Sequence, residues 1–275
     1  MPTGTLRFVK LSPHLGAEVE GLDLSGALSD SAVEALRAAL AEHQVLFFRD
    51  QRLGYESGKA LGRVFGELHI HPNTPGPEGH QEILSIHADA TSRRVAGERW
   101  HSDVSCDPVP PSVSILYLHT VPPVGGDTLF ASQTAAYDAL SPRLQAYLDG
   151  LTALHEGAPW YRASNAKEGI AETGRSYPSA VHPVVRTDPA TGRRALFVNR
   201  GFTTRINELP EAEGRAVLEF LFEHATRPEF QLRFRWQAHS VALWDNRVLQ
   251  HLAIWDYFPQ VRSGFRITVT GTRPV

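Results

Sequence analysis

The sequence predicts a mainly β protein whose helices pack outside the strands. Many short apolar segments, each bounded by glycine or proline turns, are typical of an all-β sandwich or barrel. Only a few segments show the period of an amphipathic helix. A hydrophobic content of 42% with 21% charged residues is ordinary for a chain with a substantial core. We expect residues 1–275 to fold as one continuous domain.

The helical and extended patterns follow one another along the chain. The first is an amphipathic helix at 30–43, with Ser29 or Asp30 as its N-cap. Further helices are expected at 55–65, 134–140, 142–149 and 211–225. Strands are expected at 45–49, 83–86, 112–119, 184–187, 195–198, 231–236, 241–244 and 265–270.

Residues 157–181 differ from the rest, because they show no clear periodicity. The stretch is rich in small and polar residues but carries Trp160, Tyr161 and Tyr177. A long irregular connection in a compact domain is often a lid or a disordered loop. We expect a lid loop over a substrate, with a plain surface excursion as the alternative.

Composition excludes several classes of function. The net charge of −3 and the dispersed basic residues give no reason to expect nucleic acid or an anionic membrane as a partner. No apolar stretch of ~18 residues predicts a membrane helix, and the start of the chain lacks the apolar core of a signal peptide. The single cysteine, Cys106, excludes an internal disulfide and predicts a reducing cytoplasmic location.

The pair His101 and Asp103, with His251 far along the chain, is the most informative motif. On a strand, alternate residues share a face, so His-x-Asp would direct an imidazole and a carboxylate the same way. A distant second histidine would complete the two-His, one-carboxylate triad that is typical of non-haem Fe(II) oxygenases. Arg262, just beyond, could hold a dicarboxylate co-substrate through a two-pronged ion pair. The alternative for His101 is a histidine bonded to its own i+2 aspartate in a turn.

A second His-x-Asp pair, His87 and Asp89, tests this interpretation. It leads into a polar stretch, whereas Asp103 is followed by a proline-rich loop, a strand and the sequence Gly-Gly-Asp-Thr ending at Thr128. We therefore expect His87 and Asp89 not to bind metal. Asp245, shortly before His251, is expected to cap a turn.

In these segments the chain resembles the taurine dioxygenase family, whose members depend on Fe(II) and 2-oxoglutarate. The matching segments are 66–72, 100–104, 125–130, 135–141, 182–187, 197–206, 244–251 and 262–268. The resemblance implies a double-stranded β-helix (jelly-roll) core with Fe(II), 2-oxoglutarate and O2 as metal and co-substrates. It also implies hydroxylation of a small anionic organic substrate, with succinate and CO2 as co-products.

The resemblance also implies roles for individual residues. His101, Asp103 and His251 would be the metal ligands, and Arg262 and Thr128 would hold the distal carboxylate of 2-oxoglutarate. Arg266 would bind the anionic head of the prime substrate. Arg262 and Arg266 are four apart in a strand-like run, so they would share a face; the alternative is that both are merely exposed arginines.

The substrate pocket is where the chain departs from the taurine enzymes. His71 matches their sulfonate-binding histidine, and Val104 and Phe202 match their apolar wall. Three expected larger side chains are replaced, by Thr74, Gly97 and Cys106. The resemblance with these departures predicts a wider pocket that prefers a bulkier sulfonate, sulfate ester or carboxylate over taurine. Cys106 could instead be a small apolar filler.

Other functions stay open at this point. Within the enzyme class, the alternatives are a taurine dioxygenase proper and a biosynthetic hydroxylase or desaturase of an amino-acid-like acid. Halogenation is disfavoured, because Asp103 is intact. More distant alternatives are a metal hydrolase, which would need a general base near the metal, and a non-catalytic binding barrel. We also expect a homo-oligomer, either a dimer or a tetramer.

Overall fold

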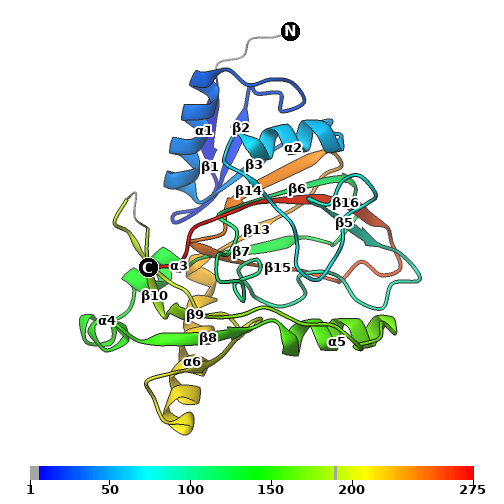
Figure 1. The fold of residues 1–275 in the computed structure, drawn as a ribbon. Helices are drawn as coiled ribbons and strands as arrows, with labels where there is room; N and C mark the ends of the chain where they lie inside the picture. The colour runs from blue at the N-terminus through cyan, green and yellow to red at the C-terminus, as the bar shows by residue number, and fades with distance from the viewer. Residues whose placement is uncertain (1–5, 189–190) are drawn as a thin grey trace.

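The computed structural model describes residues 6–188 and 191–275, and its largest element is an eight-stranded sheet (Figure 1). All neighbouring strands run antiparallel except β2 and β3, which are parallel. The order is β1 (Arg7–Lys10), β2 (Ala17–Glu20), β3 (Val45–Phe48), β14 (Ser240–Asp245), β6 (Val113–Thr120), β16 (Arg262–Val269) and β4 (Leu68–His69), and β5 (Ile83–Ala88) also pairs with β16.

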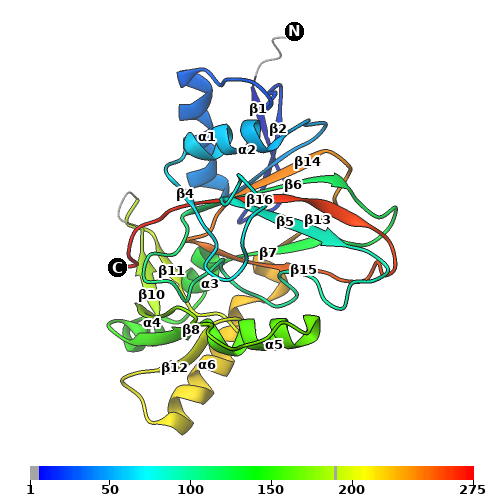
Figure 2. The same ribbon diagram turned by 45° about the vertical axis from the view of Figure 1, so that its right-hand side comes forward.

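Smaller sheets lie below the large one in Figures 1 and 2. The nearest is antiparallel, in the order β13 (Gln231–Phe234), β7 (Thr128–Ser132) and β15 (Leu249–Ala253). The others are β12 (Thr203–Ile206), β8 (Thr152–Glu156) and β9 (Ser179–Pro183), and the pair β10 (Val185–Thr187) and β11 (Arg194–Leu196). Two facing antiparallel sheets with helices outside them confirm the predicted mainly β, jelly-roll class.

Strand β3 shows how the sequence builds two cores, one on each face of the large sheet. All four of its residues are buried, and they alternate between the two faces. Leu46 and Phe48 pack toward helices α1 (Asp30–His43) and α2 (Tyr55–Arg63). Val45 and Phe47 pack instead toward the β13–β7–β15 sheet. The large sheet is therefore covered on both faces, which explains why its strands read as apolar runs.

The remaining helices lie beside the smaller sheets, and most of them are in the lower part of the molecule in Figure 2. They are α3 (Gln133–Asp138), α4 (Pro142–Leu148), α5 (Ala158–Glu168), α6 (Glu211–Ala225) and the 3-10 turn η1 (Pro228–Phe230). The predicted cap of α1 is confirmed, because Ser29 Oγ accepts a hydrogen bond from the backbone N–H of Ala32 at 3.3 Å. Among the described residues, no helix has the length and apolar character needed to cross a bilayer.

The expectation of an irregular connection at 157–181 was wrong for its first half. Residues Ala158–Glu168 form helix α5, with Pro159 in its first turn and Gly169, in the left-handed conformation, at its end. The helix is only weakly amphipathic, because its buried residues are Tyr161 and Asn165, both of which carry a polar group. Its periodicity is therefore hard to see in the sequence, whereas its terminal signals are present.

Candidate active site

Three potential metal ligands, His101, Asp103 and His251, lie together although they are far apart in the sequence. One ligand atom of each lies within 4.8 Å of those of the other two. The Nε2 atoms of His101 and His251 are 3.5 and 3.7 Å from Oδ1 of Asp103. All three side chains are buried. The structure thus brings together the three residues that the sequence singles out.

The two histidines oppose each other across an isolated antiparallel bridge. The backbone N–H of each donates to the carbonyl of the other, at 3.2 Å from His101 and 2.9 Å from His251. The expectation that His-x-Asp lies on a strand was wrong, because Asp103 begins a turn. Asn246 holds this turn: its Oδ1 accepts from the Asp103 N–H at 2.6 Å, and its Nδ2 donates to the Asp103 carbonyl at 3.0 Å.

The hydrogen bonds around the imidazole and the carboxylate suit metal binding. Nδ1 of His101 lies 2.7 Å from the carbonyl of Arg99, which can only accept. Nδ1 therefore carries the proton, and Nε2 is left as a lone-pair donor. The hydroxyl of Ser114 donates to Oδ2 of Asp103 at 2.7 Å, and Arg266 Nη1 donates to Oδ1 at 2.6 Å.

The charge state of the cluster is also appropriate. Burial raises the pKa of Asp103, but the positive charge of Arg266 outweighs it and holds that pKa well below its ordinary value. Burial lowers the pKa of His251 well below its ordinary value, so this imidazole is neutral. Two imidazoles and one carboxylate with free lone pairs are the donor set of a divalent transition metal, so the residues fit the metal that the triad implies.

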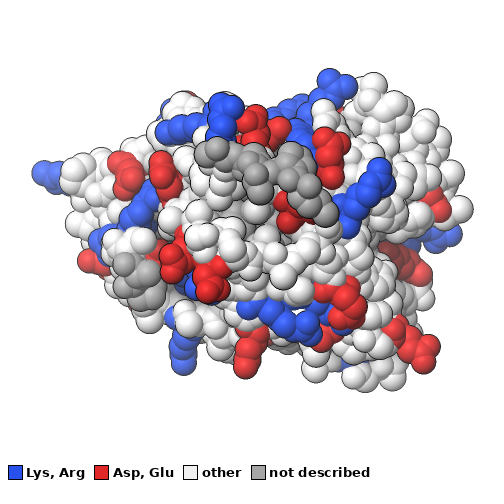
Figure 3. Space-filling view, turned by 90° about the horizontal axis from the view of Figure 1, so that it is seen from above, with Lys and Arg blue, Asp and Glu red and all other residues white. Residues whose placement is uncertain are grey.

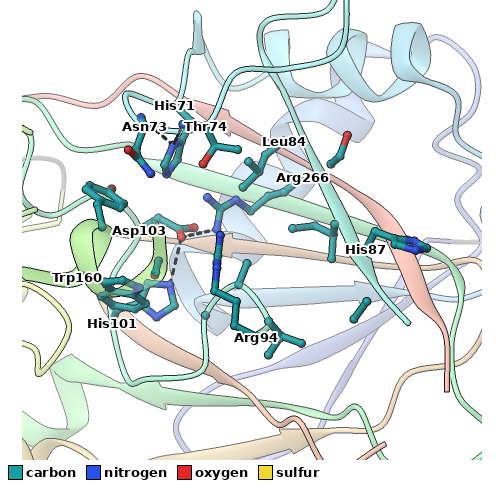
Figure 4. Close-up of a pocket in the computed structure, with 18 of the residues that line it drawn as sticks. His71, Asn73, Thr74, Leu84, His87, Arg94, His101, Asp103, Trp160 and Arg266 are labelled. Atoms are coloured by element: carbon teal, nitrogen blue, oxygen red, sulfur yellow. Dashed lines mark hydrogen bonds and ion pairs between the residues drawn. The ribbon is translucent and has the colours of Figure 1, made fainter. Parts of the chain in front are cut away.

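The cluster opens into a cavity of about 280 Å³ (Figure 4). A smaller space of about 30 Å³ adjoins it and shares Gly97, Arg262 and Arg266 with it. Several predicted site residues line the large cavity, namely His71, Thr74, Gly97, His101, Asp103, Val104, Phe202, Arg262 and Arg266. The small space adds Thr128 and His251.

Arg262 is a buried cation whose hydrogen bonds within the described chain are to neutral groups, with the carboxylate of Asp127 as a charged neighbour that is not hydrogen-bonded to it. It projects from β16, is 5% exposed, and donates to the carbonyl of Gly126 at 3.1 Å and to Oγ1 of Thr128 at 3.4 Å. Burial lowers its pKa to about 10, which still leaves it charged. Thr128 Oγ1 also accepts from Trp236 Nε1 at 2.9 Å, so its proton is free to bond an anion. The arrangement suits a carboxylate.

His71 and Arg266 provide a second group of donors in the large cavity. Nδ1 of His71 accepts from the backbone N–H groups of Asn73 and Thr74, at 3.2 and 3.1 Å (Figure 4). The proton of His71 is therefore on Nε2, which can donate. Burial lowers the pKa of His71 to about 3, so it is a neutral donor beside the charged Arg266.

Two aromatic residues that the sequence placed only in the lid stretch are part of the cavity wall. Trp160 and Tyr161 project from α5, and the Trp160 ring stacks on Phe202 at 4.8 Å between centroids. Cys106, which was expected to line the pocket, packs behind Tyr161, with Sγ 4.0 Å from its hydroxyl. Burial raises the pKa of Cys106 to about 12. Tyr161 therefore occupies space that the smaller side chain leaves.

The competing motif stands apart from the metal-binding cluster. His87, in strand β5, is exposed; it lines the large cavity, but its Nε2 lies 3.3 Å from Oδ2 of Asp89 and it is not one of the three clustered ligands. Asp245 accepts from the backbone N–H two residues on at 2.9 Å, which confirms it as a turn cap.

Comparison with known proteins agrees with this geometry. Residues 7–268 match the family described as taurine catabolism dioxygenase TauD, TfdA family. The chain is 35% identical to an alpha-ketoglutarate-dependent sulfonate dioxygenase of Saccharomyces cerevisiae, over 99% of this chain and 68% of that protein. It is 36% identical to an alpha-ketoglutarate-dependent sulfate ester dioxygenase of Pseudomonas putida, over 95% and 88%. A solved taurine dioxygenase from Burkholderia xenovorans superposes with a TM-score of 0.85 at 39% identity, over 99% and 91%.

Proposed function

Because the chain belongs to the taurine catabolism dioxygenase TauD, TfdA family, and is thus an alpha-ketoglutarate-dependent dioxygenase that uses a metal, we propose specific roles for its residues. His101, Asp103 and His251 hold Fe(II), and Arg262 and Thr128 hold the distal carboxylate of 2-oxoglutarate. The observation that carries this proposal is a buried triad next to a buried arginine whose hydrogen bonds are to a neutral carbonyl and a hydroxyl.

The protein's contribution is to orient the reactants and to exclude water. Bound iron, with 2-oxoglutarate and O2, supplies the oxidising power for hydroxylation of a C–H bond. Arg262 and Thr128 fix one end of the co-substrate, which directs its other end toward the triad. Trp160, whose ring centroid lies 4.9 Å from that of His101, covers the triad from the side of α5. We propose that α5 with the residues after it is the cover of the site.

We propose that the prime substrate is a small organic anion. Arg266 and the Nε2 proton of His71 bind its head group, and Val104, Phe202 and Trp160 bind its carbon chain. A sulfonate, a sulfate ester or a carboxylate fits this description. The named relatives act on the first two of these classes, which supports the proposal.

The nature of the surface agrees with a small-molecule substrate. On the face seen in Figure 3, basic and acidic side chains are interspersed. Nucleic acid is therefore not proposed as a partner. A single catalytic domain, a homo-oligomeric assembly and a cytoplasmic location stay predictions.

The test is turnover across a panel of anions. Purified protein is incubated with Fe(II), ascorbate and 2-oxoglutarate, and succinate is measured with and without each sulfonate, sulfate ester and carboxylate. We expect succinate formation to depend on Fe(II) and on the added anion. No anion-dependent succinate with any member of the panel would contradict the proposed substrate class.

A further inference from the structure

One face of helix α5 lines the large cavity along the length of the helix. Trp160, Ser164 and Glu168 are spaced four residues apart, and all three line the cavity. Trp160 contacts His101 at the metal end. Glu168, the last residue of the helix, therefore adds a negative charge to the cavity lining about two helical turns from the metal end, with its side chain 40% exposed to solvent.

Arg94 faces Glu168 from the opposite wall. Its side chain extends into the cavity in Figure 4, from the segment that precedes Gly97. Its Nε lies 2.9 Å from Oε1 of Glu168. The same Nε is buried and has no hydrogen-bond partner among the described residues, so the contact is an ion pair without a well-directed hydrogen bond. The two charges cancel at this end of the cavity.

A second ion pair joins the same two segments outside the cavity. Lys167 Nζ lies 2.6 Å from Oε1 of Glu98, and neither residue lines the cavity. The two segments are thus linked twice, once through groups that contribute charge to the cavity and once through groups that do not. Breaking one ion pair or the other therefore distinguishes an effect of the charge in the cavity from an effect of how firmly α5 is held.

The charges of the proposed complete site leave one cation for the substrate. A divalent metal with Asp103, and a doubly negative co-substrate with Arg262, sum to neutrality. Arg266 then requires one negative charge, and Arg94 is already neutralised by Glu168. On the basis of the proposed function, we propose that the Arg94–Glu168 pair sets the charge class of the substrate, which is a monoanion with an uncharged tail.

The proposal predicts that Glu168 selects against substrates with a second anionic group, and that Arg94 selects against substrates with a terminal cationic group. Without Glu168, Arg94 would be free to bind a second anion at the far end of the substrate. Without Arg94, Glu168 would be free to bind a terminal ammonium group. One charge-assisted hydrogen bond of this kind changes affinity by roughly tenfold.

The experiment measures binding of three matched ligand series. Alkanesulfonates, alkanedisulfonates and aminoalkanesulfonates with butane, hexane and octane chains are titrated into the enzyme loaded with Fe(II) and 2-oxoglutarate under nitrogen. Calorimetry then gives dissociation constants without turnover. The variants are Glu168→Gln, Arg94→Gln, the double variant, and Glu98→Gln as the matched control that breaks the other ion pair.

We expect the wild type to bind the monoanion most tightly. Glu168→Gln should improve the disulfonate about tenfold relative to the monoanion, and Arg94→Gln should do the same for the aminosulfonate. The double variant should return to the wild-type order, and Glu98→Gln should keep it throughout. Unchanged ratios in both single variants, an equal change in Glu98→Gln, or tighter binding of the disulfonate by the wild type would each overturn the proposal while leaving the proposed function standing. Failure of the wild type to bind any of these sulfonates would instead exclude the sulfonates from the proposed substrate class, and would overturn this inference with it.

Discussion

Replacing Arg262 by alanine tests the co-substrate site most directly. Arg262 is 5% exposed, and its recorded hydrogen bonds go to a neutral carbonyl and a hydroxyl. A carboxylate of 2-oxoglutarate would therefore be its charged partner. Truncating one member of a buried, hydrogen-bonded charge pair costs about 2–5 kcal/mol. Because water has little access to replace the guanidinium, we expect the apparent affinity for 2-oxoglutarate to fall by about 30-fold to several thousand-fold.

The assay is oxygen uptake as a function of 2-oxoglutarate at saturating prime substrate. The apparent KM for 2-oxoglutarate should rise much more than that for the prime substrate, and Arg262→Lys should give an intermediate value because lysine lacks the two-pronged geometry. Arg186→Ala is the matched control: Arg186 is also buried, with its pKa lowered to about 10, but it lines neither cavity. An unchanged KM for 2-oxoglutarate in folded Arg262→Ala would refute the assignment.

Three further outcomes follow from the same structure. Asp103→Ala should no longer bind one equivalent of iron, as measured by metal analysis after desalting. His87→Ala is the control and should retain its iron. Iron retention by Asp103→Ala would rule out the triad. Thr74→Tyr with Gly97→Asn restores the side chains that the taurine enzymes carry at these positions, and it should shift the ratio of specificity constants toward taurine by a factor of about ten per restored contact. Residue 97 has a φ of +82°, which asparagine tolerates better than most residues do. Taurine as the best wild-type substrate would contradict the reasoning. Burial lowers the pKa of His155 to about 3, so its folded form resists protonation and stability should be lost as pH falls from about 6.5 toward 3. Urea midpoints should show a shallower pH dependence in His155→Gln, and equal slopes would exclude this histidine as the cause.

The sequence predicted the central strands of the large sheet and most of the helices, but not β7 and β15, although most of their residues are buried. Residues of β3 and β14 alternate between two cores, which produces a continuous apolar run that is easy to recognise. Edge and short strands such as β1 and β12 were not anticipated. They have exposed polar positions and few apolar residues, so only their tertiary pairing defines them as strands.

The metal-binding cluster was predictable, but the shape of the cavity was not. His101, Asp103 and His251 belong to short motifs whose order along the chain carries the information. The contributions of Trp160, Arg94 and the other wall residues depend on where α5 packs, which no local pattern encodes. A helix with a weak apolar face gives little periodic signal, although the aromatic pair within it was a usable indication of a wall.

Because the bridge between His101 and His251 joins distant parts of the chain, the metal site forms only after these parts have folded together. The backbones of the two histidines are held together by main-chain hydrogen bonds between segments that are far apart in the sequence. The chain must therefore close a very long loop before two of the three donor atoms can meet. Metal affinity is then coupled to the stability of that pairing, and a bound ion stabilises the folded chain by mass action. Partial opening of β15 alone would release the ion before the rest of the molecule unfolds.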